Sequence, residues 1–188
     1  MTLYALVLFV HVSAVLVLFA ALGIEVLSLY RLRRASTVTE VLAWMEPVPR
    51  QALIGAISGP VTLLSGVYLA MRMSAFGLAW LWVALAALVL MAPLGAATGR
   101  RIRAIRRDCA EATAITSDML IRLQDPFLRI SLGARISMFL AIVLLMVAKP
   151  NLWESVSIVG SFMLFGAVMS LLGGRRGTLS APRTQLGR

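Results

Sequence analysis

Charged and metal-binding residues are scarce in this sequence. Of its 188 residues, 14% are charged, and there is one histidine and one cysteine. A soluble domain would carry about a quarter charged residues, so an ordinary soluble fold is excluded. The single Cys109 excludes an internal disulfide, and one histidine without clustered carboxylates gives little support to a zinc or copper site. A nucleophile triad, a phosphate-binding loop and a dinucleotide fingerprint are also missing.

Long apolar runs take the place of the missing charge, and 60% of the residues are hydrophobic. A helix needs about 20 apolar residues to cross about 30 Å of hydrocarbon. Five runs reach this length, at about 3–30, 52–72, 77–99, 127–148 and 153–173. The sequence therefore predicts an all-α, polytopic transmembrane helix bundle of five spans over residues 1–175.

The distribution of basic residues predicts the orientation of these spans. With the N-terminus outside, every arginine and lysine except Arg72 and Lys149 lies on the cytoplasmic side or near it. This bias is typical of membrane proteins, so we expect an N-out, C-in topology in the inner membrane of a bacterium. The net charge of +10 then has anionic lipid at the cytoplasmic face as its expected partner, and nucleic acid is not expected.

The sequence also predicts the structure of several segments that connect the spans. We expect a short helix over 37–45 that the stretch Glu46-Pro47-Val48-Pro49 ends, and a cytoplasmic helical loop at about 100–125. Asp125 and Pro126 should begin the fourth span, and Asn151 with Glu154 should cap the fifth. Residues 176–188 are expected to be a disordered cytoplasmic tail.

Small residues in the second span suggest where it packs. Gly55 and Gly59 lie four residues apart, beside a stripe that contains Ser58 and Thr62. Such small residues favour close helix approach in lipid, and the alternative is that they form one wall of a cofactor pocket.

His11 is the main candidate for a functional residue. It lies about one third of the way into the first apolar run, where a polar side chain is costly and faces protein or water. Its role is either a hydrogen bond that locks helix packing, axial ligation of haem iron, or another proton or metal function. Met146 and Met163 are weak candidates for a sixth haem ligand, since the chain has no second histidine.

Glu25 is the second polar residue of the first run. It follows His11 by fourteen residues, about 21 Å along a helix, so the two do not form one site. We expect an ion pair with Arg135 of the fourth span at the inner interface, and a role in a proton pathway is the alternative.

Three stretches carry a resemblance to a known group of proteins: HVSAVLVLFAALG in the first span, GPVTLLSGVYLAM in the second and ARISMFLAIVLLMVAKP in the fourth. They resemble a loose superfamily of small bacterial membrane proteins that includes the HemJ-type protoporphyrinogen oxidases and an uncharacterised family of predicted integral membrane proteins. In the oxidases the histidine of the first span binds haem b, so the resemblance implies a haem ligand at His11.

The chain departs from the oxidases at positions that matter for their activity. Their third span carries an essential lysine, whereas Gly77 to Gly99 contains none. Leu18 and Ala21 replace a tryptophan and a glycine that follow the histidine, and the oxidases have four helices instead of five. The resemblance is therefore nearer to the uncharacterised branch, and it does not imply an enzyme.

Three hypotheses for the function remain at this point. The first is an integral inner-membrane protein that binds haem b through His11 or retains the scaffold of such proteins. The second is a non-catalytic accessory or scaffold subunit of a membrane complex, or a homo-oligomer, to which the small-residue faces point. The third and weaker hypothesis is a small-solute transporter, which has little support because buried charges are few.

Overall fold

The chain folds into helices only, over the part that the structure describes. The structure is a computed structural model, and it describes residues 2–35, 37–110, 116 and 121–178. The elements are α1 (Leu3–Leu32), α2 (Val38–Met45), α3 (Pro47–Arg72), the 3-10 helix η1 (Ala75–Gly77), α4 (Ala79–Ala110), α6 (Pro126–Ala148) and α7 (Leu152–Thr178). Five helical stretches are long and apolar enough to cross a membrane, with α2 and α3 counted as one. The predicted all-helical architecture with five candidate spans is confirmed.

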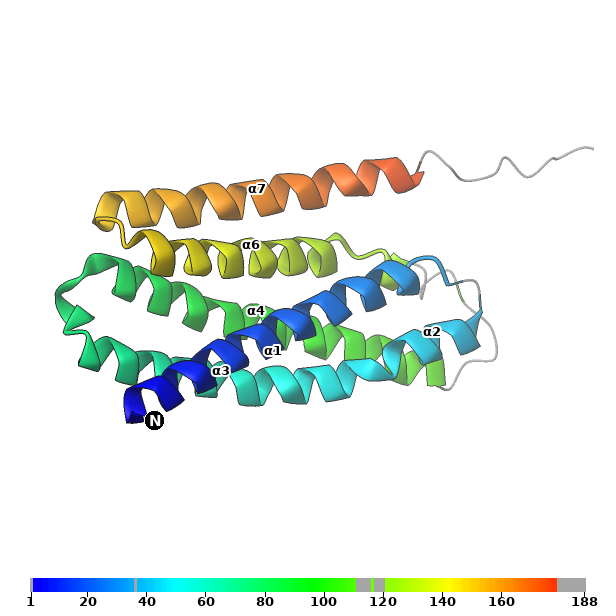
Figure 1. Cartoon of the computed structure of the whole chain (residues 1–188). Helices are drawn as coiled ribbons and strands as arrows, with labels where there is room; N and C mark the ends of the chain where they lie inside the picture. Colours follow the sequence, from blue (N-terminus) through cyan, green and yellow to red (C-terminus); the bar gives the residue numbers. More distant parts are fainter. Residues whose placement is uncertain (1, 36, 111–115, 117–120, 179–188) are drawn as a thin grey trace, which may run out of the picture.

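The helices run side by side in an elongated bundle (Figure 1). α1 packs mainly on α3, α4 packs on α6, and α7 lies against α6 with a smaller contact to α4. In the most apolar stretch of Ile121–Ala148, 56% of the residues are buried, compared with 11% in that of Leu152–Leu172. The helix α6 is therefore the centre of the bundle, and α7 is its outermost helix.

Two large apolar clusters fill the interior, and a smaller third one surrounds Trp80 and Leu81. One large cluster surrounds Met91, Met138 and Leu145 between α1, α4 and α6, and there the Phe19 and Phe139 rings stack with centroids 5.5 Å apart. The other lies at the end of the bundle that holds α2, where Leu29, Ile105 and Leu128 are among its buried members. We call this the basic end, because the arginines that follow α1 and end α4 are there. These clusters fix the relative positions of the helices that carry polar groups.

The predicted helix caps are present. Asp125 Oδ1 accepts a hydrogen bond from the Phe127 amide at 2.8 Å, and Pro126 is the first residue of α6. Asn151 Oδ1 accepts from the Glu154 amide at 3.0 Å, while Glu154 Oε2 accepts from the Asn151 amide at 3.2 Å. This reciprocal pair satisfies two of the backbone donors that every helix start leaves free.

Several observed helices extend beyond the boundaries of the expected spans. Glu46 alone separates α2 from α3, and Pro47 and Pro49 lie inside the first turn of α3, where a missing amide hydrogen costs no helical hydrogen bond. Of the loop expected at 100–125, α4 takes up residues as far as Ala110, and 111–115 and 117–120 lie outside the described residues. Of the tail expected at 176–188, the first three residues continue α7, and 179–188 lie outside the described residues.

Close helix approach occurs at different glycines from those expected. A Cβ atom added to Gly55 or Gly59 would meet no described atom within 4 Å, so neither residue marks a tight contact. The tight crossing is between α6 and α7, where a Cβ on Gly166 would overlap Ser137 Oγ and lie 2.7 Å from the Gly133 carbonyl oxygen. Without a Cβ at these two positions the α6 and α7 backbones can touch, which is the packing that small residues allow in lipid.

Candidate functional site

A polar seam runs along the contact between α1 and α3. The buried residues of α1 recur every three to four positions and include His11, Ala14, Ala21, Glu25 and Ser28. The buried residues of α3 include Gln51, Ser58, Thr62 and Ser65. Both helices therefore turn their polar and small side chains toward protein and their large apolar side chains outward, as expected for helices whose outer surface meets lipid.

His11 lies at one end of this seam, with 7% of its surface exposed. Its Nδ1 atom is 3.1 Å from the Thr62 carbonyl oxygen and 3.0 Å from Ser65 Oγ, both on α3. The Ser65 hydroxyl donates to the Val61 carbonyl, so its oxygen can accept from the imidazole. A carbonyl oxygen only accepts, and Nδ1 must therefore carry the proton.

This arrangement leaves the other ring nitrogen as a lone-pair donor. With the proton on Nδ1, the neutral imidazole presents Nε2 unprotonated, and no described residue donates a hydrogen bond to it. Metal-ligating histidines commonly donate their second ring N–H to a backbone carbonyl in this way, which fixes the ring and raises the basicity of the ligand. The geometry is therefore that of an oriented potential ligand.

Gly66 makes room for the imidazole. A Cβ atom added to Gly66 would lie 3.1 Å from His11 Cε1, closer than nine in ten real Cβ contacts. Beside it, Thr62 Oγ1 is buried without a hydrogen-bond partner among the described atoms. The residues of the second span beside the histidine are Thr62, Ser65 and Gly66, one to two turns beyond the glycines singled out from the sequence.

The two methionines lie elsewhere. Met146, on α6, packs against the apolar clusters around Met138 and Trp80, and Met163, on α7, packs against the first of these clusters. The hydrogen bonds of His11 are with α3, and α7 packs on α6 and α4. Neither methionine takes part in the hydrogen-bonded group around His11.

Glu25 forms the second polar site of the seam, toward the basic end. Its Oε1 accepts a hydrogen bond from Arg135 Nη2 of α6, and its Oε2 accepts one from Gln51 Nε2 of α3 at 3.2 Å. All three residues are more than nine-tenths buried. The ion pair expected from the sequence is thus present, and Gln51 joins it as a third member from a third helix.

The fourth core helix borders the same site. A Cβ on Gly95 of α4 would lie 3.4 Å from Arg135 Nη1, so the absence of a side chain there leaves space for the guanidinium. One turn further on, Thr98 Oγ1 and Ser131 Oγ are hydrogen-bonded at 2.8 Å between α4 and α6. Gln51 Oε1 and Arg135 Nε are buried without a partner among the described atoms. Three helices thus contribute polar side chains to the buried site, and α4 borders it at Gly95.

Sequence reasoning alone did not find Gln51. It lies just before the expected start of the second span at residue 52, so it was not counted among intramembrane residues. Because α3 begins at Pro47, the side chain lies a full turn inside the helix. The available signal was its place in a stripe with Ser58, Thr62 and Ser65 at helical spacing.

Comparisons with models of protein families, with curated proteins and with solved structures found no match to this chain. Among the described residues, no group of three or more histidine, cysteine, aspartate or glutamate side chains is arranged to hold a metal ion. The two sites of the seam are therefore interpreted from their own chemistry.

Proposed function

We propose that this chain is a multi-pass membrane protein that holds haem b through Nε2 of His11. The observation that carries the proposal is the hydrogen bond from His11 Nδ1 to the Thr62 carbonyl, which presents Nε2 of this buried side chain as an unprotonated, oriented ligand. Bound haem would supply one-electron redox chemistry. The residues of this chain would orient the ligand and keep water from it.

The donor set fits axial ligation by one residue. Imidazole is a common haem ligand, and Ser65 and Gly66 hold the ring in one orientation. Among the described residues, the hydrogen-bonded group around His11 contains no second side chain of a kind that commonly ligates haem iron. Oxidase activity is not part of the proposal, because the span from Gly77 to Gly99 has no lysine.

The alternative is that His11 only joins α1 to α3 and that the chain is an accessory or scaffold subunit. The same two hydrogen bonds support that role, since each links the two helices directly. The two functions differ in one observable property, which is whether the protein carries a haem.

The test is an absorption spectrum of the full chain purified from membranes in mild detergent, with haem available during expression. We expect a Soret band that is lost in His11→Gln, a variant that keeps a polar, hydrogen-bonding side chain but cannot ligate haem iron in the same way. Gly66→Ala should shift or weaken the band, because its Cβ would press on the imidazole. Gly59→Ala, whose Cβ would meet nothing within 4 Å, is the matched control and should leave the band unchanged.

Two outcomes would count against haem binding. The first is a colourless protein, and the second is a band that survives His11→Gln. A colourless protein that co-purifies with a stoichiometric membrane partner would support the accessory role.

A further inference from the structure

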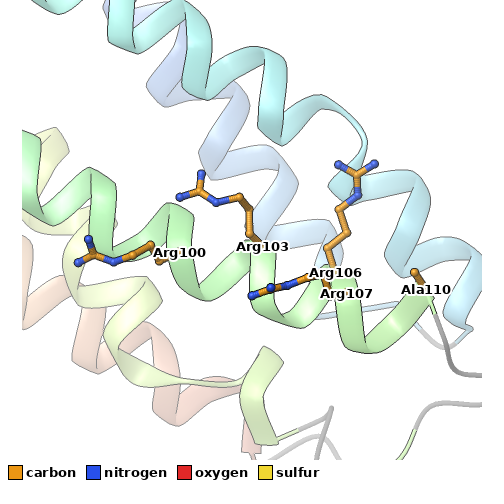
Figure 2. Close-up of a pocket in the computed structure, with 5 residues that line it drawn as sticks. All are labelled: Arg100, Arg103, Arg106, Arg107 and Ala110. Atoms are coloured by element: carbon orange, nitrogen blue, oxygen red, sulfur yellow. The ribbon is translucent and has the colours of Figure 1, made fainter.

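Four arginines line a hollow on the surface of α4, immediately after its apolar stretch ends at Gly99. They are Arg100, Arg103, Arg106 and Arg107, with Ala110 at the far end. The hollow has a volume of about 590 Å³, within the range of about 300–1,000 Å³ that is typical of small-molecule sites. Figure 2 shows the four side chains leaving the same short stretch of α4 and spreading apart at their guanidinium ends.

The helix that carries them is anchored on its other side. Ile102, Ile105 and Cys109 are buried in the apolar cluster of the basic end, against Leu29 and Leu128. The backbone under the arginines is therefore fixed by packing. A ligand in the hollow would meet four charges whose attachment points are already positioned.

Other arginines near this end have partners within the chain, whereas these four have no carboxylate partner among the described residues. Arg101 pairs with Asp125, Arg122 pairs with Asp108 at 2.7 Å, and Arg31 lies over the Trp44 ring at 5.3 Å from its centroid. None of the four arginines of the hollow forms an ion pair with a carboxylate in the described part of the chain. Four like charges in one hollow repel each other, and an anion placed among them would relieve this repulsion.

The basic end as a whole is crowded with positive charge. The Arg33 guanidinium, which follows α1, donates a hydrogen bond to the Asp125 carbonyl oxygen at 3.1 Å. Burial, followed by repulsion from Arg129, lowers the pKa of Arg33 from 12.5 to about 10. Arg33 therefore stays charged at neutral pH and adds to the positive field of this end.

The hollow begins where the apolar surface of α4 ends. A Cβ atom on Gly99 would lie 3.5 Å from Arg103 Nη1, so this guanidinium is folded back along α4 toward the apolar stretch. Val89 and Leu90, two to three turns earlier, are exposed large apolar residues of the same helix. One elongated molecule with an anionic head and apolar tails could contact both regions.

We propose that this hollow binds the headgroup of an anionic phospholipid with two phosphates, such as a diphosphatidylglycerol. The planar guanidinium matches phosphate oxygens in pairs, so four arginines can hold two phosphates. Basic pockets beside transmembrane helices bind such headgroups on the side of the membrane that carries anionic lipid. The proposal requires that α4 spans the membrane, and it is independent of His11 and of haem.

The test uses the full chain in mild detergent, with lipid binding measured by native mass spectrometry. The probes are tetraoleoyl diphosphatidylglycerol, dioleoyl phosphatidylglycerol, dioleoyl phosphatidylcholine and, as soluble phosphates, inorganic pyrophosphate and a short DNA oligonucleotide. The test variant is Arg100→Gln/Arg103→Gln/Arg107→Gln. The matched control is Arg31→Gln/Arg34→Gln/Arg50→Gln, which removes the same charge at the same end from arginines that already have partners.

A hydrogen bond from a guanidinium to a phosphate strengthens binding by roughly tenfold or more, so the test variant, which removes three such arginines, should bind diphosphatidylglycerol at least on the order of 100-fold more weakly. The control should lose less than about fivefold, because its arginines lie outside the hollow. Equal losses in both triple variants would overturn the site, as would equal binding of phosphatidylcholine. Displacement of the lipid by pyrophosphate at equal concentration would assign the hollow to a soluble phosphate ligand, and displacement by the oligonucleotide would assign it to nucleic acid. Either result would also overturn the proposal.

Discussion

Arg135→Met would remove the positive charge that lies against the Glu25 carboxylate and leave that carboxylate in the core of the bundle. Both residues are 7% exposed, and the Gln51 amide would be the remaining described donor to the carboxylate. At an effective dielectric constant of 20, two unit charges 4 Å apart interact by about 4 kcal/mol. Breaking a buried pair from one side costs about 3–5 kcal/mol, because the remaining charge is desolvated without compensation. We expect a loss of this size in the free energy of unfolding.

Removing both charges should be much less harmful than removing one. In Glu25→Gln/Arg135→Met no charge is left in the core, and the glutamine can still accept the hydrogen bond from Gln51. We expect the double variant to lie within about 1–2 kcal/mol of the unmodified protein, since buried ion pairs replaced as a unit are often nearly neutral. The chain also offers a matched control in the pair of Arg50 and Glu46, 2.9 Å apart, with side chains that are 77% and 54% exposed. Arg50→Met should change stability by less than about 0.5 kcal/mol.

The free energies can be measured by reversible unfolding in mixed micelles, followed by circular dichroism. If Arg135→Met cost no more than Arg50→Met, the buried pair would contribute nothing that an exposed pair does not. If the double variant were no more stable than Arg135→Met, the loss of stability in Arg135→Met would come from lost packing and not from an uncompensated charge. Either result would refute the electrostatic argument.

Two further predictions concern α7. Gly166→Ala should destabilise the protein by about 1–3 kcal/mol, because its Cβ would overlap Ser137 Oγ and crowd the Gly133 backbone. Gly160→Ala, which has open space around it, should be neutral or slightly stabilising in the same unfolding measurement. A loss of equal size in both variants would contradict the close crossing of α6 and α7. Asn151→Ala should cost about 1 kcal/mol through the loss of the cap that pairs with Glu154, and a variant as stable as the unmodified protein would show that the cap contributes nothing.

The length of the apolar runs was sufficient to predict the number of candidate spans and most of their boundaries. A helix in lipid must satisfy its own backbone hydrogen bonds, so an apolar run of sufficient length leaves little choice of structure. The caps at Asp125 and Asn151 were also predictable, because their chemistry is local and short in sequence. The last residues of α4 and α7 were not predictable, since good helix formers can continue a helix beyond the apolar stretch at small cost.

Which side of each helix faces its neighbours was harder to predict. α1 and α6 are apolar on nearly all sides, so their hydrophobic pattern does not distinguish the lipid-facing surface from the buried one. Gly55 and Gly59 have the spacing of a packing motif, and so do Gly133 and Ser137, but close contact is found at the second pair. Small residues permit close approach without requiring it, and the choice depends on which helix is adjacent.

The polar residues indicate the buried side of a helix better than the glycines do, because a polar side chain in a membrane helix has to face protein or water. His11 and Glu25 are fourteen residues apart in α1, and Ser65 and Gln51 are fourteen residues apart in α3. Since the two helices are antiparallel, the contact of His11 with Ser65 and that of Glu25 with Gln51 belong to the same register, with about 21 Å between them. A shift of α1 by one turn along α3 would break both contacts, leaving His11 without its partners on α3 and Glu25 without Gln51. The seam therefore fixes the position of α1 from both ends, and it holds His11 in place whether or not the imidazole carries a haem.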